Sequence, residues 1–178
     1  MAGRFVLETP RLTLREFDEE DVEAYYRIGS NEAVVRYTGN GPLESLDQAR
    51  QVLRANPLAD YRRDGFGRWA CVLKTSGEII GFAGLKRLAD LNEVDVAFWL
   101  LPEHWGAGLA TEAGHATLAY GFEHLGLRQI IGLVDPQNLG SIRVLEKLGM
   151  SYSGVIDYQG EATIQYSIES GGSTPDVR

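Results

Sequence analysis

The sequence predicts a single α/β domain built around one mixed sheet. Short segments that alternate apolar and polar residues, as strands do, recur along the chain, and longer segments with the three-to-four-residue spacing of helices separate them. No internal repeat and no linker divides the chain, so we expect one domain over residues 1–170. Residues 171–178, which begin Gly-Gly-Ser-Thr-Pro, are expected to form a disordered tail.

The first third of the chain is expected to hold one strand and two helical segments. Leu12–Arg15 alternates as a strand does. Asp18 precedes the acidic residues 19–21 and is expected to cap a helix that extends to about Ile28. After a loop at residues 38–42, helical spacing resumes at Leu46 and is expected to end near residue 65.

Strand patterns dominate the rest, interrupted by two helices. The expected strands are 67–74, 79–86, 94–101 and 128–134, followed by a closing hairpin of 155–158 and 163–168. The expected helices are 111–125, after a glycine-rich break, and 138–148, which is expected to stop at Gly149.

The composition excludes several classes of protein. Hydrophobic residues make up 44% of the chain and charged residues 24%, which are ordinary globular values. No segment approaches the ~20 apolar residues of a membrane span, none resembles a signal peptide, and no basic stripe offers a nucleic-acid surface. With one cysteine, Cys71, no internal disulfide is possible. We therefore expect a cytoplasmic protein with neither a membrane nor a nucleic-acid partner, in which Cys71 fills the core.

The segment from Val94 to Ala113 reads as a strand, a tight loop and the start of a helix. Such a loop turns successive backbone N–H groups toward one point, and the helix dipole favours negative charge there. Because Gly106 and Gly108 lack Cβ atoms, phosphate oxygens can approach the backbone closely. The segment therefore predicts a pyrophosphate cradle that needs no basic side chain.

Three other interpretations of these glycines were weighed. A Walker loop needs Gly-Lys-Ser/Thr, and no Lys follows Gly108. A dinucleotide fingerprint needs a third glycine where this chain has Thr111, and residues 102–105 separate the strand from the glycines. A glycine-rich turn with a purely structural role remains the third.

A second segment, Val134 to Met150, contains Asn138 at a helix start and Ser141 in the first turn. Their polar atoms are expected at the mouth between two adjacent strands. A role for Asn138 as a helix cap alone accounts equally well for its position.

Together these segments resemble the acetyl-CoA motifs of the GNAT superfamily, and the whole chain is similar to its RimJ/RimL-type branch. That branch has an opening like Thr9-Pro10-Arg11-Leu12-Thr13-Leu14-Arg15, a tryptophan-glycine loop like residues 105–113 and a second motif like residues 138–149. The match spans about residues 9–168.

The resemblance implies a mostly antiparallel, twisted sheet, flanked by helices, whose strands 94–101 and 128–134 splay apart to admit the cofactor. Acetyl-CoA is the implied cosubstrate. Its pantetheine would pair with the backbone near Phe98, Trp99 and Leu100, and its pyrophosphate would rest on the amides of the loop. The implied cofactor contacts are Phe98, Trp99, Leu100, Trp105, Gly106, Ala107, Gly108, Leu109, Ala110, Thr111, Asn138 and Ser141.

The chain departs from the superfamily at two places. The loop begins with Trp105 where many members have Gln or Arg. Leu145 stands where many have the tyrosine that protonates the leaving thiolate. Ser141 matches a polar position of the branch and is our candidate acid, with Tyr152 or Tyr166 in reserve.

Asp95 is the candidate base, since it matches a glutamate that some relatives use in this role. A water relay is expected, because an aspartate is short and, with a reference pKa of ~3.9, a weak base unless burial raises that value. The alternatives are that Asp95 is an ordinary polar strand residue, or that Glu93 on the same face is the base. Direct attack of the amine is expected, because Cys71 lies outside every motif.

The reaction implied is transfer of acetyl to a primary amine, either a protein N-terminal α-amine or a small molecule. The net charge of −8 favours a cationic acceptor. A catalytically silent acyl-CoA sensor is the alternative. The histidines are placed too far apart to share a metal, so no metal is expected, and the chain is expected to be a monomer or a homodimer.

Overall fold

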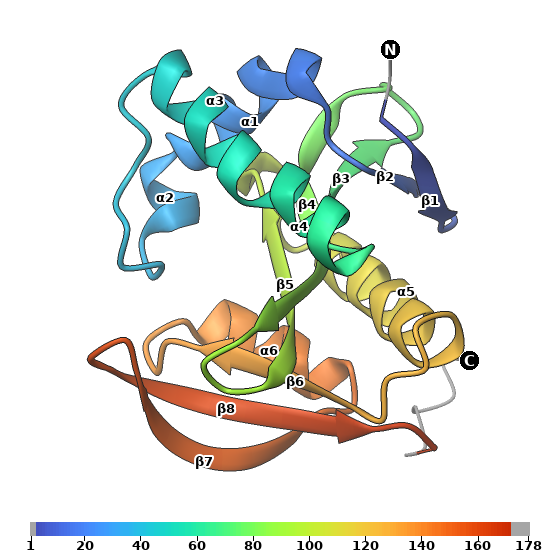
Figure 1. The fold of residues 1–178 in the computed structure, drawn as a ribbon, viewed down its shortest axis with the longest axis vertical. Coiled ribbons are helices and arrows are strands. Elements are labelled where there is room, and N and C mark those ends of the chain that lie inside the picture. The colour runs from blue at the N-terminus through green and yellow to red at the C-terminus, as the bar shows by residue number, and fades with distance from the viewer. Residues whose placement is uncertain (1–2, 172–178) are drawn as a thin grey trace.

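A computed structural model describes residues 3–171, so the tail predicted beyond Gly171 lies outside the described residues. Figure 1 shows one twisted sheet with helices on both sides. Its eight strands follow the order β1-β2-β3-β4-β5-β6-β8-β7. Every neighbouring pair is antiparallel except β5 and β6, which run parallel. The predicted α/β fold with a mostly antiparallel sheet is therefore confirmed.

The elements have the following bounds. The strands are β1 (Phe5–Glu8), β2 (Leu12–Arg15), β3 (Arg68–Leu73), β4 (Ile79–Leu88), β5 (Glu93–Leu100), β6 (Gln129–Val134), β7 (Ser151–Tyr158) and β8 (Glu161–Glu169). The α-helices are α1 (Val22–Gly29), α2 (Glu32–Val35), α3 (Leu46–Ala55), α4 (Pro57–Asp64), α5 (Leu109–Glu123) and α6 (Leu139–Lys147), and short 3₁₀ turns lie at Glu19–Asp21 and Pro102–His104.

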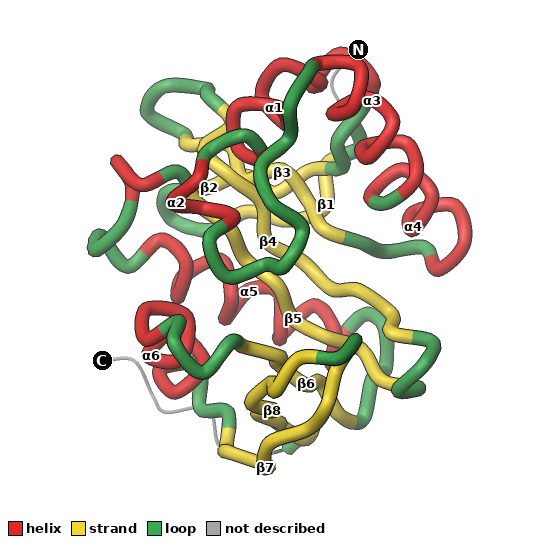
Figure 2. The backbone as a smooth tube through the Cα atoms, turned by 90° about the vertical axis from the view of Figure 1, so that its left-hand side faces the viewer, coloured by secondary structure: helices red, strands yellow, loops and turns green. Residues whose placement is uncertain are grey.

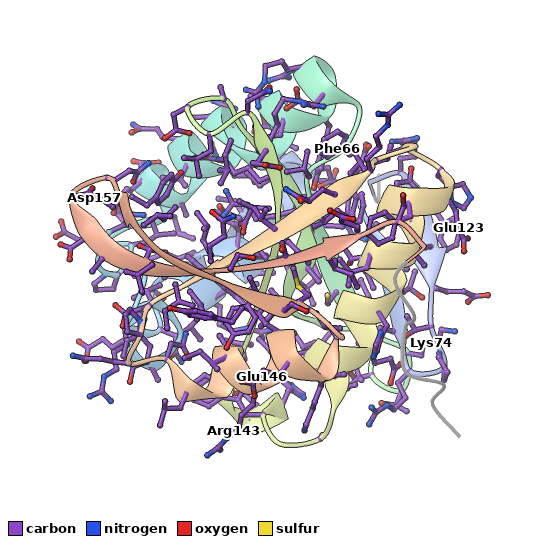
Figure 3. All side chains as sticks on the ribbon, turned by 90° about the horizontal axis from the view of Figure 1, so that it is seen from below. Phe66, Lys74, Glu123, Arg143, Glu146 and Asp157 are labelled. Carbon is purple, nitrogen blue, oxygen red and sulfur yellow. The ribbon has the colours of Figure 1, made fainter. Side chains whose placement is uncertain are left out.

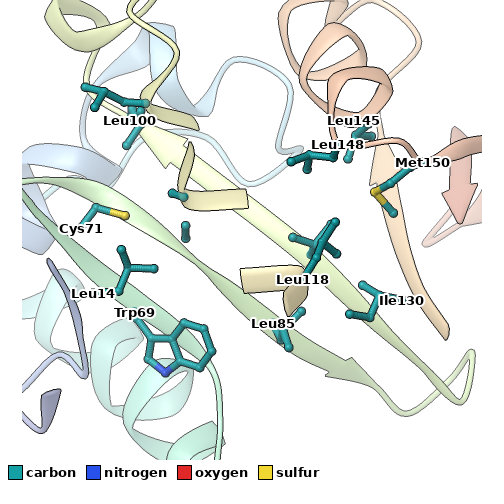
Figure 4. Packing of buried hydrophobic residues seen from close by; sticks show 14 of the residues in the cluster. Leu14, Trp69, Cys71, Leu85, Leu100, Leu118, Ile130, Leu145, Leu148 and Met150 are labelled. Carbon is teal, nitrogen blue, oxygen red and sulfur yellow. The ribbon is translucent and has the colours of Figure 1, made fainter. Parts of the chain in front are cut away.

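The sheet separates two hydrophobic clusters, one on each face. On one face α5 and α6 pack against the strands around Trp69, Leu85 and Ile130, as Figure 4 shows. On the other face α1 and α3 pack around Phe82 and Leu101. Figure 2 shows the strands between these two groups of helices. Because side chains alternate along a strand, β5 presents Val94, Val96 and Leu100 to the first cluster, and Ala97 and Trp99 to the second. Asp95 shares the face of Ala97 and Trp99.

The sheet opens between β5 and β6. These strands share a single paired position, Asp95 opposite Ile131. The remainder of β6 pairs with β8 on its other side, and the remainder of β5 pairs with β4. Beyond Asp95 the facing edges of β5 and β6 are therefore free of each other, which is the splay that the sequence resemblance implied.

The remaining differences from the sequence-based expectations are local. The helix predicted to run from Leu46 to about residue 65 is two helices, because Pro57 has no N–H to continue α3 and instead occupies the first turn of α4. Helix α5 begins at Leu109 rather than Thr111, and the closing hairpin is longer than predicted. Strand β1 and helix α2, each of four residues, were not predicted. None of the helices within residues 3–171 combines the length and hydropathy needed to cross a bilayer.

Candidate functional site

The loop between β5 and α5 presents backbone donors that the protein leaves unused. Gly106 and Gly108 have φ angles of 74° and 78°, in the left-handed region that favours glycine. The consecutive N–H groups from Gly106 to Thr111 have no acceptor among residues 3–171. Most buried or helix-terminal donors in proteins are paired, so this row of free donors is a place for an anion.

The start of α5, like the starts of α1 and α4, has no side-chain cap. Asn31, Ser45 and Asn138 cap α2, α3 and α6 through side-chain oxygens. The residue in the same position of α5 is Gly108, which has no side-chain oxygen to accept a hydrogen bond from the first N–H groups of the helix. The first N–H groups of α5 are therefore without an acceptor among residues 3–171, and helix starts of this kind favour anions.

A clamp from the N-terminal strands holds this loop in place. The Glu112 carboxylate accepts hydrogen bonds from the Thr9 hydroxyl at 2.6 Å, the Arg11 backbone N–H at 2.9 Å and the Arg11 Nε–H at 2.7 Å. Arg11 also donates from Nη1 to the Ala107 carbonyl at 2.8 Å. Burial alone would raise the pKa of Glu112, but these hydrogen bonds lower it. The opening motif of the sequence thus fixes a loop about a hundred residues away.

The side chain of Trp105 also holds the loop in place. Its ring is largely exposed, yet its Nε1–H donates to the Leu100 carbonyl at 2.6 Å. This bond ties the loop back to the end of β5. The sequence-based argument assigned only the backbone of this residue a role, and the indole contact was missed because it depends on the turn at 102–104.

Asp95 stands where β5 and β6 separate. Its Oδ1 accepts a hydrogen bond from the backbone N–H of Leu133 at 2.9 Å. Leu133 lies two residues beyond Ile131, the last residue of β6 that pairs with β5. The carboxylate therefore replaces the strand partner that Leu133 has lost, and no residue within 3–171 donates to its Oδ2.

The surroundings of Asp95 change its acidity. Burial raises its pKa to about 7, while the hydrogen bond from Leu133 and the charges of Arg68 and Lys86 act in the opposite direction. A carboxylate with a pKa near the working pH is matched to proton transfer. Such perturbed groups beside an opening are functional-site candidates.

Asn138 and Ser141 lie on the opposite side of the opening, at the start of α6. The Asn138 side-chain Oδ1 accepts from the Ser141 backbone N–H at 3.1 Å, so the capping role weighed for Asn138 is present. The cap uses neither the Asn138 amide nitrogen nor the Ser141 hydroxyl, and both remain without a partner among the described residues.

The other candidates for proton transfer are engaged elsewhere. Leu145 is buried, and its side chain fills the space above Gly132 of β6. The Tyr166 hydroxyl donates to Glu146 at 3.3 Å, and Tyr152 is largely exposed. Glu93 accepts a hydrogen bond from Gln129 at 2.9 Å. Figure 3 shows Glu146 on α6 and Asp157 near the tip of the β7–β8 hairpin.

The structure leaves no accessible nucleophilic thiol. Cys71 is fully buried on the α5 side of the sheet, and burial raises the pKa of its thiol well above the usual range. Within residues 3–171, no group of three or more His, Cys, Asp or Glu side chains could hold a metal ion.

The predicted site residues fall into three groups around one opening. Phe98, Trp99 and Leu100 form the free end of β5, the loop and first turn of α5 supply residues 105–111, and Asn138 and Ser141 begin α6. Sequence reasoning missed Arg68, Lys86 and the Glu112 clamp. An arginine that opens an otherwise apolar strand was the only available signal for Arg68.

Comparisons with known proteins agree with this geometry. The family model described as the acetyltransferase (GNAT) domain matches residues 11–151. An uncharacterized N-acetyltransferase, YoaA of Bacillus subtilis, is 34% identical over 152 residues, or 85% of each chain. The spermidine N(1)-acetyltransferase of Escherichia coli is 29% identical, covering 82% of this chain and 76% of its own. An acetyltransferase structure from Agrobacterium tumefaciens superposes with a TM-score of 0.82 at 27% identity over 96% of both chains.

The uncapped helix beside the parted sheet and these similarities lead to one conclusion: the chain belongs to the GNAT acetyltransferase family and is an acetyl-CoA-dependent N-acetyltransferase.

Proposed function

We propose that this enzyme moves acetyl from acetyl-CoA to a primary amine by direct attack, with both substrates bound at the opening between β5 and β6. The observation that carries the proposal is the juxtaposition of unused N–H groups from Gly106 to Thr111 with the Asp95 carboxylate at the branch point of the sheet. One part suits an anionic cofactor, and the other suits proton removal from an amine.

The cofactor contacts proposed from the sequence fit this arrangement. The amides from Trp105 to Thr111 would hold the pyrophosphate, helped by the dipole of α5. The backbone of Phe98, Trp99 and Leu100, on the edge that β6 leaves, would pair with the pantetheine as a missing strand would. The Leu100 carbonyl, which accepts from the Trp105 Nε1–H, would take no part in this pairing. The Asn138 amide nitrogen, which the helix cap does not use, would donate to the pantetheine from the far side.

Asp95 is proposed to accept the proton of the attacking amine, directly or through one water. Lysine-like amines have a pKa of ~10.4 and α-amines ~8, so deprotonation at pH 7 costs roughly 4.6 or 1.4 kcal/mol. With a pKa of about 7, Asp95 is a better base than an ordinary aspartate. Its bond to Leu133 fixes Oδ1 and leaves Oδ2 for the proton.

Ser141 is proposed to protonate or stabilise the leaving thiolate. Its hydroxyl is unengaged in the first turn of α6, where the dipole also favours negative charge. Many relatives have a tyrosine acid at the position of Leu145. Because Leu145 is buried and has no acidic proton, Ser141 is the better candidate in this chain. Burial of Cys71 supports direct attack over an acetyl-cysteine intermediate.

The acceptor is proposed to be either a protein N-terminal α-amine or a small-molecule amine. The resemblance of the motifs to the RimJ/RimL-type branch supports a protein α-amine, and the similarity to a spermidine acetyltransferase supports a small molecule. A cytoplasmic location and a monomer or homodimer remain parts of the same proposal.

The test is the rate at which free CoA thiol appears when acetyl-CoA and a panel of amines are mixed with the protein. An enzyme releases thiol in proportion to amine. Binding of acetyl-CoA without amine-dependent release would overturn the proposal in favour of an acyl-CoA sensor.

A further inference from the structure

Arg68 is an inward arginine without an acidic partner. Its Nε is buried and has no hydrogen-bond acceptor, and its guanidinium forms no ion pair with any residue of the described chain, 3–171. Arg15, whose side chain is 16% exposed, is bound by both carboxylate oxygens of Asp21 at 2.7 and 2.8 Å. A buried N–H group without an acceptor is costly, so the unpaired Nε of Arg68 needs an explanation.

The neighbouring carboxylates do not supply that acceptor. Asp60 on α4 is buried, but it is bound by Arg63 at 2.8 Å and lies 3.9 Å from the Lys86 ammonium. Lys86 also donates to Asn56 at 3.1 Å. Asp95 accepts its hydrogen bond from the backbone of Leu133. Each of these neighbouring charged groups therefore has a partner, whereas Arg68 has no carboxylate partner among the described residues.

The position of Arg68 connects it to the reaction. In the register of the sheet Arg68 lies opposite Gly84, and Gly84 lies opposite Ala97, two residues after Asp95. All three residues therefore lie on the face of the sheet that also carries Asp95, and the backbone of Gly67 and Arg68 fills the space above Gly84. The guanidinium carbon lies 5.6 Å from the centre of the Phe82 ring, which in turn lies 4.8 Å from the ring of Trp99 on β5.

Electrostatic effects agree with this placement. The charge of Arg68 contributes to lowering the pKa of Asp95 against the effect of burial. Burial and the charges of Asp90 and Asp95 raise the pKa of Tyr158, at the end of β7, and the charge of Arg68 lowers it. Arg68, Asp95 and Tyr158 therefore share one electrostatic environment on the face of the sheet opposite α5.

We propose that Arg68 binds an anionic group, a carboxylate foremost, on the amine acceptor, so that the enzyme selects an amino-acid-like amine over a polyamine. The inference rests on the proposed function and specifies its substrate class. A guanidinium presents a planar fork that binds a carboxylate through two parallel hydrogen bonds. Anchored in this way, an amino acid would carry its amine toward Asp95.

Local and overall charge point to different acceptors, and the local charge decides. The net charge of −8 attracts cations at long range, but salt screens such fields beyond about 8–10 Å. At the site itself the charges of Arg68 and Lys86 act on Asp95, and the buried Asp60 carboxylate is already bound by Arg63. The two cations would repel the second and third ammonium groups of a polyamine. A contact with Phe82 alone would leave the N–H donors of Arg68 without acceptors.

The experiment compares amines that differ only in a carboxylate: tyrosine with tyramine, ornithine with putrescine, and lysine with cadaverine, together with spermidine. In the wild-type enzyme we expect kcat/KM to be at least tenfold higher for at least one carboxylate-bearing member of a pair. Arg68→Gln should lower kcat/KM for that member about tenfold or more relative to its decarboxylated partner, mainly through KM. Because loss of the Arg68 charge also raises the pKa of Asp95, both proteins are assayed well above pH 7, where Asp95 is ionised in each.

The exposed Arg62→Gln is the matched control and should change neither member. Arg68→Lys keeps the positive charge but lacks the planar guanidinium, so it should retain part of the preference for the carboxylate-bearing amine. It replaces Arg68→Gln in the experiment if Arg68→Gln does not fold. Binding of acetyl-CoA reports whether each variant is folded. A wild-type preference for spermidine or the decarboxylated amines, or an equal loss for both members of a pair in Arg68→Gln, would overturn the inference while leaving the acetyltransferase proposal intact. Absence of thiol release with every amine would instead contradict the proposed function.

Discussion

The Asp95 carboxylate and the backbone N–H of Leu133 are joined by a 2.9 Å hydrogen bond at the position where two parallel strands separate. The bond satisfies a donor that the splay would otherwise leave unpaired. It also holds the carboxylate at the entrance of the gap, so one contact stabilises the opening and orients the group proposed to act in it.

Asp95→Asn is predicted to retain the fold and lose most of its activity. The amide oxygen of asparagine can still accept from Leu133, but asparagine cannot accept a proton from an amine. We expect kcat/KM to fall at least tenfold, a loss of ~1.4 kcal/mol in transition-state stabilisation.

The dependence of kcat/KM on pH tests the same role of Asp95. Because the Asp95 pKa lies at about 7 and the base must be ionised, wild-type kcat/KM should rise through pH 7. The ionisation near pH 7 should be missing from the Asp95→Asn profile. An Asp95→Asn enzyme with the wild-type profile and rate would exclude Asp95 as the base.

The same substitution is predicted to raise stability at alkaline pH. The folded protein holds the Asp95 proton up to about pH 7, whereas an unfolded chain releases it near pH ~3.9. The folded state binds more protons between these values, so the Asp95 contribution to the free energy of unfolding falls as pH rises. Asparagine carries no such titration.

Thermal unfolding measures this effect. The Tm of Asp95→Asn relative to wild type should be higher at pH 8 than at pH 4, while the exposed Asp90→Asn should show no such trend. A Tm difference that stays constant with pH would show that burial does not perturb Asp95.

Glu112→Gln is predicted to loosen the pyrophosphate loop. Three hydrogen bonds from Thr9 and Arg11 converge on this carboxylate, and bonds to a charged group are worth about 1.5–3 kcal/mol each. We expect a lower Tm and a several-fold higher Kd for acetyl-CoA, measured by calorimetry. Glu123→Gln, at the exposed end of the same helix, is the control. Equal effects from both variants would show that the Glu112 hydrogen bonds do not hold the loop.

Ser141→Ala is predicted to lower kcat without changing Tm or the affinity for acetyl-CoA more than slightly. The Asn138 cap uses the Ser141 backbone, so the substitution leaves it intact. Asn138→Ala, in contrast, should lower Tm, since loss of a cap costs about 1 kcal/mol. A Ser141→Ala enzyme with unchanged kcat would return the role of the acid to Tyr166 or a bound water.

Much of the fold could be predicted from the sequence because the central elements have clear periodicity. The strand around Val96, in which buried and less buried residues alternate, is an example. The tight turn at Gly106 and Gly108 could also be foreseen, since it depends on backbone and glycine rather than on distant side chains.

The parts that could not be predicted depend on contacts between distant segments. Glu112 meets Arg11 across about a hundred residues, and Asp95 meets Leu133 through the parting of two strands. The isolation of Arg68 is visible only when the partners of every neighbouring charge are known.

The most direct test of the central claim is calorimetric titration of acetyl-CoA into wild type, Gly108→Asp and Gly77→Asp. Both glycines have positive φ angles, 78° and 74°, and room for a side chain, so both substitutions strain the backbone alike. Only Gly108 lies in the proposed pyrophosphate cradle. Binding by wild type and Gly77→Asp, with at least tenfold weaker binding by Gly108→Asp, is the predicted result; no heat with wild type, or equal affinity in all three proteins, would contradict it.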